Sequence, residues 1–165
     1  DRGDVRAPKG AWTCCVEDDT TQAGYVGARA PTNNTGELTA LRAALCTAMA
    51  RPRGAGDEDI WADSLYAINM TTGRWRPKCK RNTIMVGDMR CIWRKLQRLR
   101  PHEVRLRHVR SHVKVPGNEL ADWLADLGRH SESVSRERAE EWLKAWLHRQ
   151  QRWIDSERAG GAPTA

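Results

Sequence analysis

Several common features are missing from this sequence of 165 residues. No apolar run approaches the roughly 18 residues that a membrane-spanning helix requires, and the first residues lack a signal-peptide pattern. The chain begins with Asp1 rather than Met, so we expect that an upstream segment was removed or is not included. Hydrophobic residues make up 39% and charged residues 30%. This composition favours a soluble chain with one domain of ordinary size.

Cysteine is present, but not in a pattern that builds a framework. The five cysteines are odd in number, and no two have C-x-x-C spacing. The sequence therefore indicates neither a set of disulfides nor a zinc site. We expect an intracellular, reducing compartment, and the composition does not choose between nucleus, organelle and cytoplasm.

Acidic residues are too few to balance the basic ones. The net charge is +7 and the isoelectric point is near 9.5, which favours an acidic partner, most commonly nucleic acid. From Arg74 to Arg110 thirteen Lys and Arg face only Asp88 and Glu103, a local balance of +11 that leaves −4 for the rest. This segment predicts a phosphate-binding face beside carboxylates, and the alternative is a solvated helix surface.

The pattern of apolar residues predicts mixed secondary structure. Strands at 12–17 and 24–29, joined by turn residues, predict a hairpin. Helical spacing of Leu and Ala follows over 35–50, with Thr35 as N-cap and Arg51-Pro52 as the stop. The later expected elements are a strand at 60–64, a short helix to 70, a basic loop at 71–82, a helix at 83–99, a strand at 104–112, and helices at 118–130 and 135–158. The order β-β-α-β-α-α-β-α-α indicates the α/β class.

Three acids lie at the ends of these elements: Glu37, Asp63 and Asp122. Such acids can converge at one edge of a sheet, and their mutual repulsion is relieved when they share divalent cations such as Mg²⁺. Each also has a simpler interpretation. Glu37 would favour a helix N-terminus, Asp63 would cap the following helix, and Asp122 would lie on the surface.

Three stretches together resemble type 1 ribonuclease H: "TNNTGELTALRAAL" at 32–45, "ADSLYAIN" at 62–69 and "HVRSHVKVPGNELADWLAD" at 108–126. They occur in the family's order and spacing, and the resemblance covers roughly residues 4–128. It implies a ribonuclease H-like mixed sheet with helices on both faces. The extra C-terminal amphipathic helix, with its stripe Ala139, Trp142, Leu143, Trp146 and Trp153, either packs on the domain or binds a partner. We expect a domain at 1–130, truncated at its N-terminus, a helical extension at 131–158 and a disordered tail at 159–165.

The resemblance also implies roles for single residues. Glu37, Asp63 and Asp122 match the family's metal-binding acids, which hold Mg²⁺ or Mn²⁺ for two-metal cleavage of phosphodiesters. His112 matches a loop histidine that moves protons and helps the product leave; the alternative is a loop histidine without a role. The expected nucleic-acid contacts are Asn33, Asn34, Arg74, Trp75, Arg76, Lys78, Lys80, Arg81 and Asn118.

One part of the family pattern is missing, namely the first strand that ends in "TDGS" and carries the central metal-binding aspartate. "GDVRAPKGAW" at 3–12 resembles the loop after that strand, and Asp1 and Asp4 are the only acids nearby. Three explanations stay open: the sequence is incomplete, another chain supplies the strand, or catalysis has been abandoned. Loss of that strand would leave unpaired backbone on both of its neighbours.

Two functions follow from the resemblance. The first is endonucleolytic hydrolysis of the RNA strand of RNA/DNA hybrids by two-metal-ion catalysis. The second is a non-catalytic nucleic-acid-binding subunit of a larger RNA–protein or reverse-transcriptase assembly. The expected partners are an RNA/DNA hybrid or structured RNA, and a protein that supplies the missing strand or docks on the C-terminal helix. No membrane partner is expected.

Overall fold

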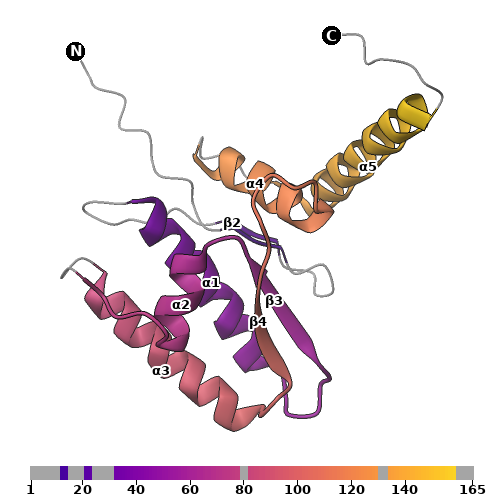
Figure 1. The fold of residues 1–165 in the computed structure, drawn as a ribbon. Coiled ribbons are helices and arrows are strands. Elements are labelled where there is room, and N and C mark those ends of the chain that lie inside the picture. Colours follow the sequence, from indigo (N-terminus) through magenta and orange to yellow (C-terminus); the bar gives the residue numbers. More distant parts are fainter. Residues whose placement is uncertain (1–11, 15–20, 24–31, 79–81, 130–133, 159–165) are drawn as a thin grey trace.

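The computed structural model describes residues 12–14, 21–23, 32–78, 82–129 and 134–158. Its elements are β1 (Trp12–Cys14), β2 (Thr21–Ala23), α1 (Asn33–Ala50), β3 (Glu58–Ala62), α2 (Leu65–Thr72), α3 (Thr83–Leu99), β4 (Val104–His108), α4 (Pro116–Arg129) and α5 (Arg136–Arg158) (Figure 1). This order confirms the predicted succession of strands and helices and the α/β class. In the part of the chain that is described, no helix is long and apolar enough to cross a membrane.

The first two strands form the predicted hairpin, and its second strand begins earlier than predicted. β1 and β2 pair in antiparallel fashion, with Trp12 opposite Ala23 and Cys14 opposite Thr21. Residues 21–23 were expected in the turn, and the expected strand at 24–29 lies outside the described residues. Thr21 is β-branched and suits a strand, so the turn-forming residues end before it.

The other two strands form a parallel pair joined by helices. β3 and β4 run side by side, from Glu58 opposite Val104 to Ala62 opposite His108. Parallel strands need a long crossover, and α2 and α3 provide it. Both strands end earlier than predicted, so Asp63 follows β3 and residues 109–112 have left β4. The last bond of the pair runs from the Val109 N–H to the Ala62 carbonyl at 3.1 Å. Within the described residues, this pair and the hairpin are separate two-stranded sheets.

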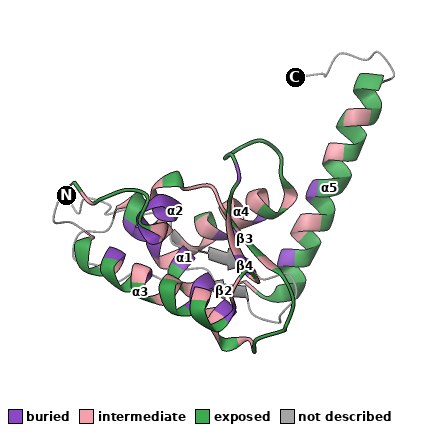
Figure 2. Cartoon of the chain, turned by 60° about the horizontal axis from the view of Figure 1, so that its bottom comes forward, coloured by how far each residue is buried: buried purple, intermediate pink, exposed green. Residues whose placement is uncertain are grey.

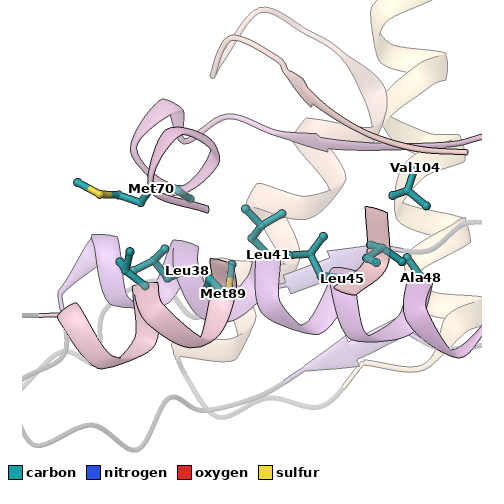
Figure 3. Close-up of a cluster of buried hydrophobic side chains, with 10 residues drawn as sticks. Leu38, Leu41, Leu45, Ala48, Met70, Met89 and Val104 are labelled. Carbon is teal, nitrogen blue, oxygen red and sulfur yellow. The ribbon is translucent and has the colours of Figure 1, made fainter. Parts of the chain in front are cut away.

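The core lies between α1, α2, α3 and the parallel pair. One face of α1 is buried through Leu38, Leu41, Leu45 and Ala48, as their helical spacing predicted. Figure 3 shows these side chains facing Met70, Met89 and Val104, which come from α2, α3 and β4. α1 also contacts β1 and β3, and α4 contacts β1 and β2. Two different helices therefore cover the hairpin.

The start of α1 differs from the prediction. The N-cap is Thr32, not Thr35: Thr32 has extended backbone, its hydroxyl accepts from the Thr35 N–H at 3.2 Å, and Thr35 completes a capping box with its own hydroxyl. Thr32 performs this task because its side chain reaches the N–H of the third helical residue. The helix begins earlier than expected, and its first turn contains no acid. Glu37 therefore lies in the second turn, where the helix dipole stabilises its carboxylate less than in the first turn.

A buried arginine closes the amino ends of the parallel pair. Arg100 is 1% exposed, and its guanidinium donates to Glu58 at 2.9 Å, to Glu103 at 3.1 Å, and to the Ala48 and Gly56 carbonyls at 2.9 Å each. Burial opposes the charge of Arg100, but its bonds to Glu58 and Glu103 outweigh this effect and raise its pKa. The hydrogen bonds of the guanidinium together join α1, the loop before β3, and the turn before β4 into one unit.

The C-terminal helix packs against α4. Ala139 is buried with Leu120 and Leu124, and Trp142 stacks on Trp123 with 5.0 Å between ring centroids and 14° between planes. The predicted packing of the tryptophan stripe on the domain is confirmed for this first half of α5. Further along the stripe Trp146 is 8% exposed, whereas Trp153 is 46% exposed.

Candidate active site and nucleic-acid interface

Asp63 is the first residue beyond β3, at the carboxyl end of the parallel pair. The following helix is capped by Ser64, whose hydroxyl accepts from the Ala67 N–H at 3.2 Å. The simpler interpretation of Asp63 as that cap is therefore wrong. Its carboxylate instead accepts a hydrogen bond of 2.9 Å from the hydroxyl of Ser111, which lies beyond the end of β4. This bond fixes the carboxylate at the edge where both strands end.

The segment between β4 and α4, residues 109–115, is called the His112 loop below. His112 Nδ1 lies 3.5 Å from Asp122 Oδ2 in α4. The imidazole is 76% exposed and the carboxylate 30% exposed, so the histidine covers the acid from the solvent side. His112 is thus in contact with one of the predicted acids, and Asp122 is not simply a surface residue.

The start of α4 explains how Asp122 is positioned. The helix begins at Pro116, two residues earlier than expected, because proline is favoured at a first helical position where its missing N–H costs nothing. Glu119 then reaches back, and its carboxylate accepts from the Lys114 N–H at 3.2 Å. This bond joins the His112 loop to the first turn of α4.

Of the predicted residues, the structure brings His112 into contact with Asp122, and it links Asp63 to Ser111, which was not predicted. Glu37 is half-buried in the second turn of α1. Carboxylate and hydroxyl oxygens are the donors that Mg²⁺ prefers, so the kind of donor suits such an ion. Their placement does not complete a site, since no three His, Cys, Asp or Glu side chains within the described ranges gather closely enough to hold a metal ion.

The predicted asparagines lie beside the basic segment. Asn33 and Asn34 are exposed in the first turn of α1. The next residue, Thr35, donates from its hydroxyl to the Asn82 side-chain carbonyl at 3.2 Å, and Asn82 directly precedes α3. Figure 1 shows the two helix starts on the same side of the molecule. The asparagines and Asn82, the last residue of the basic loop at 71–82, therefore belong to one surface.

Residues 74–78 of the basic loop are largely exposed, and a hydrogen bond from Arg90 anchors their backbone. Arg74, Arg76 and Lys78 are exposed, and Trp75 is 47% exposed. Arg90 of α3 donates to the Met70 carbonyl at 2.9 Å and to the Trp75 carbonyl at 2.6 Å. Lys80 and Arg81 lie outside the described residues. A cationic, partly aromatic surface with a fixed backbone can contact phosphates and bases.

Other residues of the basic run have internal partners. Arg100 is buried in its ion pairs, and Arg105 pairs with Asp57 at 2.8 Å and with Asp59 at 2.6 Å. Arg107 also contacts Asp59, at 3.3 Å, and these arginines hold the pKa of Asp59 below its usual value, with the Arg105 hydrogen bond as the largest cause. The sequence count therefore overstated the charge available to phosphates.

Two site features were missed or behave differently. Ser111 was not among the predicted site residues, and no sequence signal indicated that it bonds Asp63. Asn118 was expected to contact nucleic acid, but its side-chain Nδ2 is buried and has no hydrogen-bond partner.

Comparison with known proteins identifies the family of the chain. The sequence profile of the family described as RNase H matches residues 4–130. A ribonuclease H of Cupriavidus pinatubonensis is 32% identical over 127 residues, covering 73% of this chain and 84% of that protein. A ribonuclease H of Nitratidesulfovibrio vulgaris is 32% identical over 123 residues, covering 70% and 76%, and one of Cupriavidus necator is 30% identical over 135 residues, covering 78% and 88%.

No solved structure matches the chain significantly. The family consists of nuclease-type hydrolases that bind RNA/DNA hybrids and generally use divalent metal ions. The profile covers well over half of the chain, and three relatives reach 30% identity over most of their length. The chain therefore belongs to the ribonuclease H family.

Proposed function

We propose that the chain cuts the RNA strand of RNA/DNA hybrids endonucleolytically, with Mg²⁺ or Mn²⁺ as cofactor. The observation that carries this proposal is the exposed edge where β3 and β4 end. There Ser111 orients Asp63, and His112 lies against Asp122. An acid held by a neutral donor and an acid in contact with an imidazole suit the handling of cations and protons next to a phosphate backbone.

In this proposal Glu37, Asp63 and Asp122 would hold the metal ions. Two such ions, when bound, supply an activated water and stabilise the leaving oxygen. Ser111 would keep the Asp63 carboxylate in one orientation through its bond of 2.9 Å. His112, with its ring mostly in solvent, would exchange protons between the site and water, because an imidazole accepts and releases protons near neutral pH.

Substrate recognition would use the surface at the starts of α1 and α3. Asn33 and Asn34 would contact the minor groove, where 2′-hydroxyls distinguish a hybrid from DNA. Arg74, Arg76 and Lys78 would contact phosphates, and Trp75 would stack on a base or sugar. The exposure of these side chains supports this assignment. Binding should then weaken steeply as salt increases.

The proposal needs one more acid, which the family's first strand ordinarily provides. Asp1 or Asp4 would fill this place, or a segment that is not in this sequence would supply it. This question separates the proposed enzyme from a second candidate, a binding subunit that does not cut. The second candidate is favoured by the lack of a three-residue metal cluster among the described residues.

The deciding experiment is cleavage of a labelled RNA/DNA hybrid with Mg²⁺, with Mn²⁺ and with EDTA. The protein is compared with Asp63→Asn and with Asp59→Asn, a matched change on β3 of an acid that pairs with arginines. Cutting that requires metal and Asp63 but not Asp59 supports the enzyme. Salt-sensitive binding without cutting supports the binding subunit, and a strand ending in "TDGS" added before Asp1 then tests whether only that piece is lacking.

We also propose that the protein works in an intracellular, reducing compartment. Cys46 and Cys91 are free thiols in the structure, which supports this placement without locating the protein further. Titration of the unfolded protein with a thiol reagent, without added reductant, should find all five cysteines reduced. Fewer than five would contradict the proposal.

A further inference from the structure

The C-terminal helix reaches the His112 loop although it lies beyond the family match. The profile ends at residue 130, and α5 runs over Arg136–Arg158. Its first half is fixed on α4 by the stacked Trp123 and Trp142. Figure 2 shows the rest of the helix as mostly exposed, with buried and intermediate residues in a stripe. A helix that is anchored at one end and long enough to extend past its anchor can support a distant loop.

The contact is made by Trp153 of α5 and Lys114 of the loop. The Lys114 Nζ lies 4.0 Å from the centroid of the Trp153 ring, which is the geometry of a cation–π interaction. Trp153 follows Trp142 by about three helical turns, so both rings project from the same side of α5. Trp153 is 46% exposed, and this contact gives a reason for a large aromatic side chain there.

The loop is in a conformation that needs external support. His112 has φ of 56° and Lys114 has φ of 60°, both in the left-handed region that residues with a side chain rarely adopt. Such conformations persist when surrounding contacts determine them. Lys114 has two contacts of this kind: its N–H donates to Glu119, and its ammonium group lies over Trp153. His112 is two residues away and mostly exposed.

We propose that α5 holds the His112 loop in its working conformation through Trp153 and Lys114. Both are then positioning residues, because they act through His112 and do not touch the substrate. The catalytic part of this proposal rests on the function proposed above; the holding of the loop does not. In this arrangement the imidazole stays 3.5 Å from Asp122. Without the contact the loop samples other conformations, and the imidazole is misplaced for part of the time.

The test uses the full chain with Trp153→Leu, which removes the ring, and Trp153→Phe, which keeps one. Leu147→Ala is the matched control, since Leu147 is also on α5 and 45% exposed. The first readout is trypsin cleavage after Arg110 in the native protein, followed by mass spectrometry. We expect Trp153→Leu to be cut about fivefold faster, as fits loss of an exposed cation–π contact. Trypsin should cut Trp153→Phe at close to the wild-type rate, and it should cut Leu147→Ala at the wild-type rate.

The second readout is hybrid cleavage, where Trp153→Leu should lower kcat several-fold and leave KM unchanged, because the phosphate-binding surface lies elsewhere. Lys114→Gln combined with Trp153→Leu should lower kcat no further than either substitution alone, since both remove the same contact. Unchanged trypsin cleavage in Trp153→Leu overturns the proposal, as does equal acceleration in Leu147→Ala. If the wild type does not cut hybrid, the catalytic part fails with the proposed function, and trypsin still decides whether α5 holds the loop.

Discussion

The two ends of the parallel pair β3–β4 use charged residues in opposite ways. At the amino ends Arg100 is 1% exposed and donates four hydrogen bonds, to two carboxylates and two carbonyls. At the carboxyl ends Asp63 accepts a hydrogen bond from Ser111, and His112 lies against Asp122 with most of its ring in solvent. The same two strands therefore carry a buried network of charged groups at their amino ends and solvent-exposed charged groups at their carboxyl ends.

This difference separates structural charge from charge that is available for function. A buried guanidinium is tolerated when it is paired and hydrogen-bonded, and its four bonds within the protein commit Arg100 to the fold. At the other end the carboxylate of Asp63 accepts from a neutral hydroxyl, and Asp122 lies against the imidazole of His112. The carboxyl ends of the strands are accordingly where we expect cations and substrate to bind.

The largest expected effect is on activity at the carboxyl ends of β3 and β4. Asp122→Asn should reduce hybrid cleavage by at least about 100-fold, which corresponds to about 2.7 kcal/mol of barrier, and leave the thermal unfolding midpoint nearly unchanged. Asp126→Asn, one turn further along α4, is the matched control and should keep activity. Cleavage at a wild-type rate by Asp122→Asn would remove this residue from the site.

The next effect is on stability at the amino ends of these strands. Arg100→Met should lower the free energy of unfolding by about 3 kcal/mol, because it leaves Glu58, Glu103 and two carbonyls without their donor. Urea unfolding followed by tryptophan fluorescence measures this. Arg98→Met, at an exposed residue in the last turn of α3, should change this free energy by less than about 0.5 kcal/mol. Similar small losses for both variants would mean that the network is not structural.

A smaller effect is expected for the hydroxyl that orients Asp63. Ser111→Ala should lower hybrid cleavage about fivefold, as fits the loss of one hydrogen bond worth about 1 kcal/mol. Ser111→Thr keeps the hydroxyl and should retain more activity than Ser111→Ala. If the alanine variant were the more active of the two, the bond of 2.9 Å would not serve catalysis.

The smallest effect concerns acid pH. The Gly54 N–H, and after it Arg100, hold the pKa of Glu103 below its ordinary value. A lowered pKa contributes stability above the unfolded-state value of about 4.3, and this contribution is lost as pH falls through the folded-state value. The urea midpoint of the wild type should therefore fall more between pH 7 and pH 3 than that of Glu103→Gln. Parallel curves for the two proteins would show that Glu103 does not contribute to acid sensitivity.

The sequence predicted the elements better than their ends. The buried stripe of α1 followed from the spacing of Leu38, Leu41 and Leu45, since helical periodicity is local information. The start of the second hairpin strand and the N-cap of α1 were each predicted three residues too late, because several neighbouring Thr and Asp side chains suit a cap or a turn almost equally well. For Asp63, a cap and a site residue were both consistent with the sequence, and the hydroxyl of Ser64 decided between them.

The sequence by itself determined the order of elements, the family and the identity of the candidate acids, because periodicity and motif spacing are properties of neighbouring residues. Only the tertiary structure decided which charges are available. Arg100 and Arg74 look alike in one basic run, yet Arg100 meets partners more than 40 residues away and is buried, while Arg74 is exposed. The contacts of Ser111 with Asp63 and of Lys114 with Trp153 likewise join distant segments, and the fold alone brings such segments together.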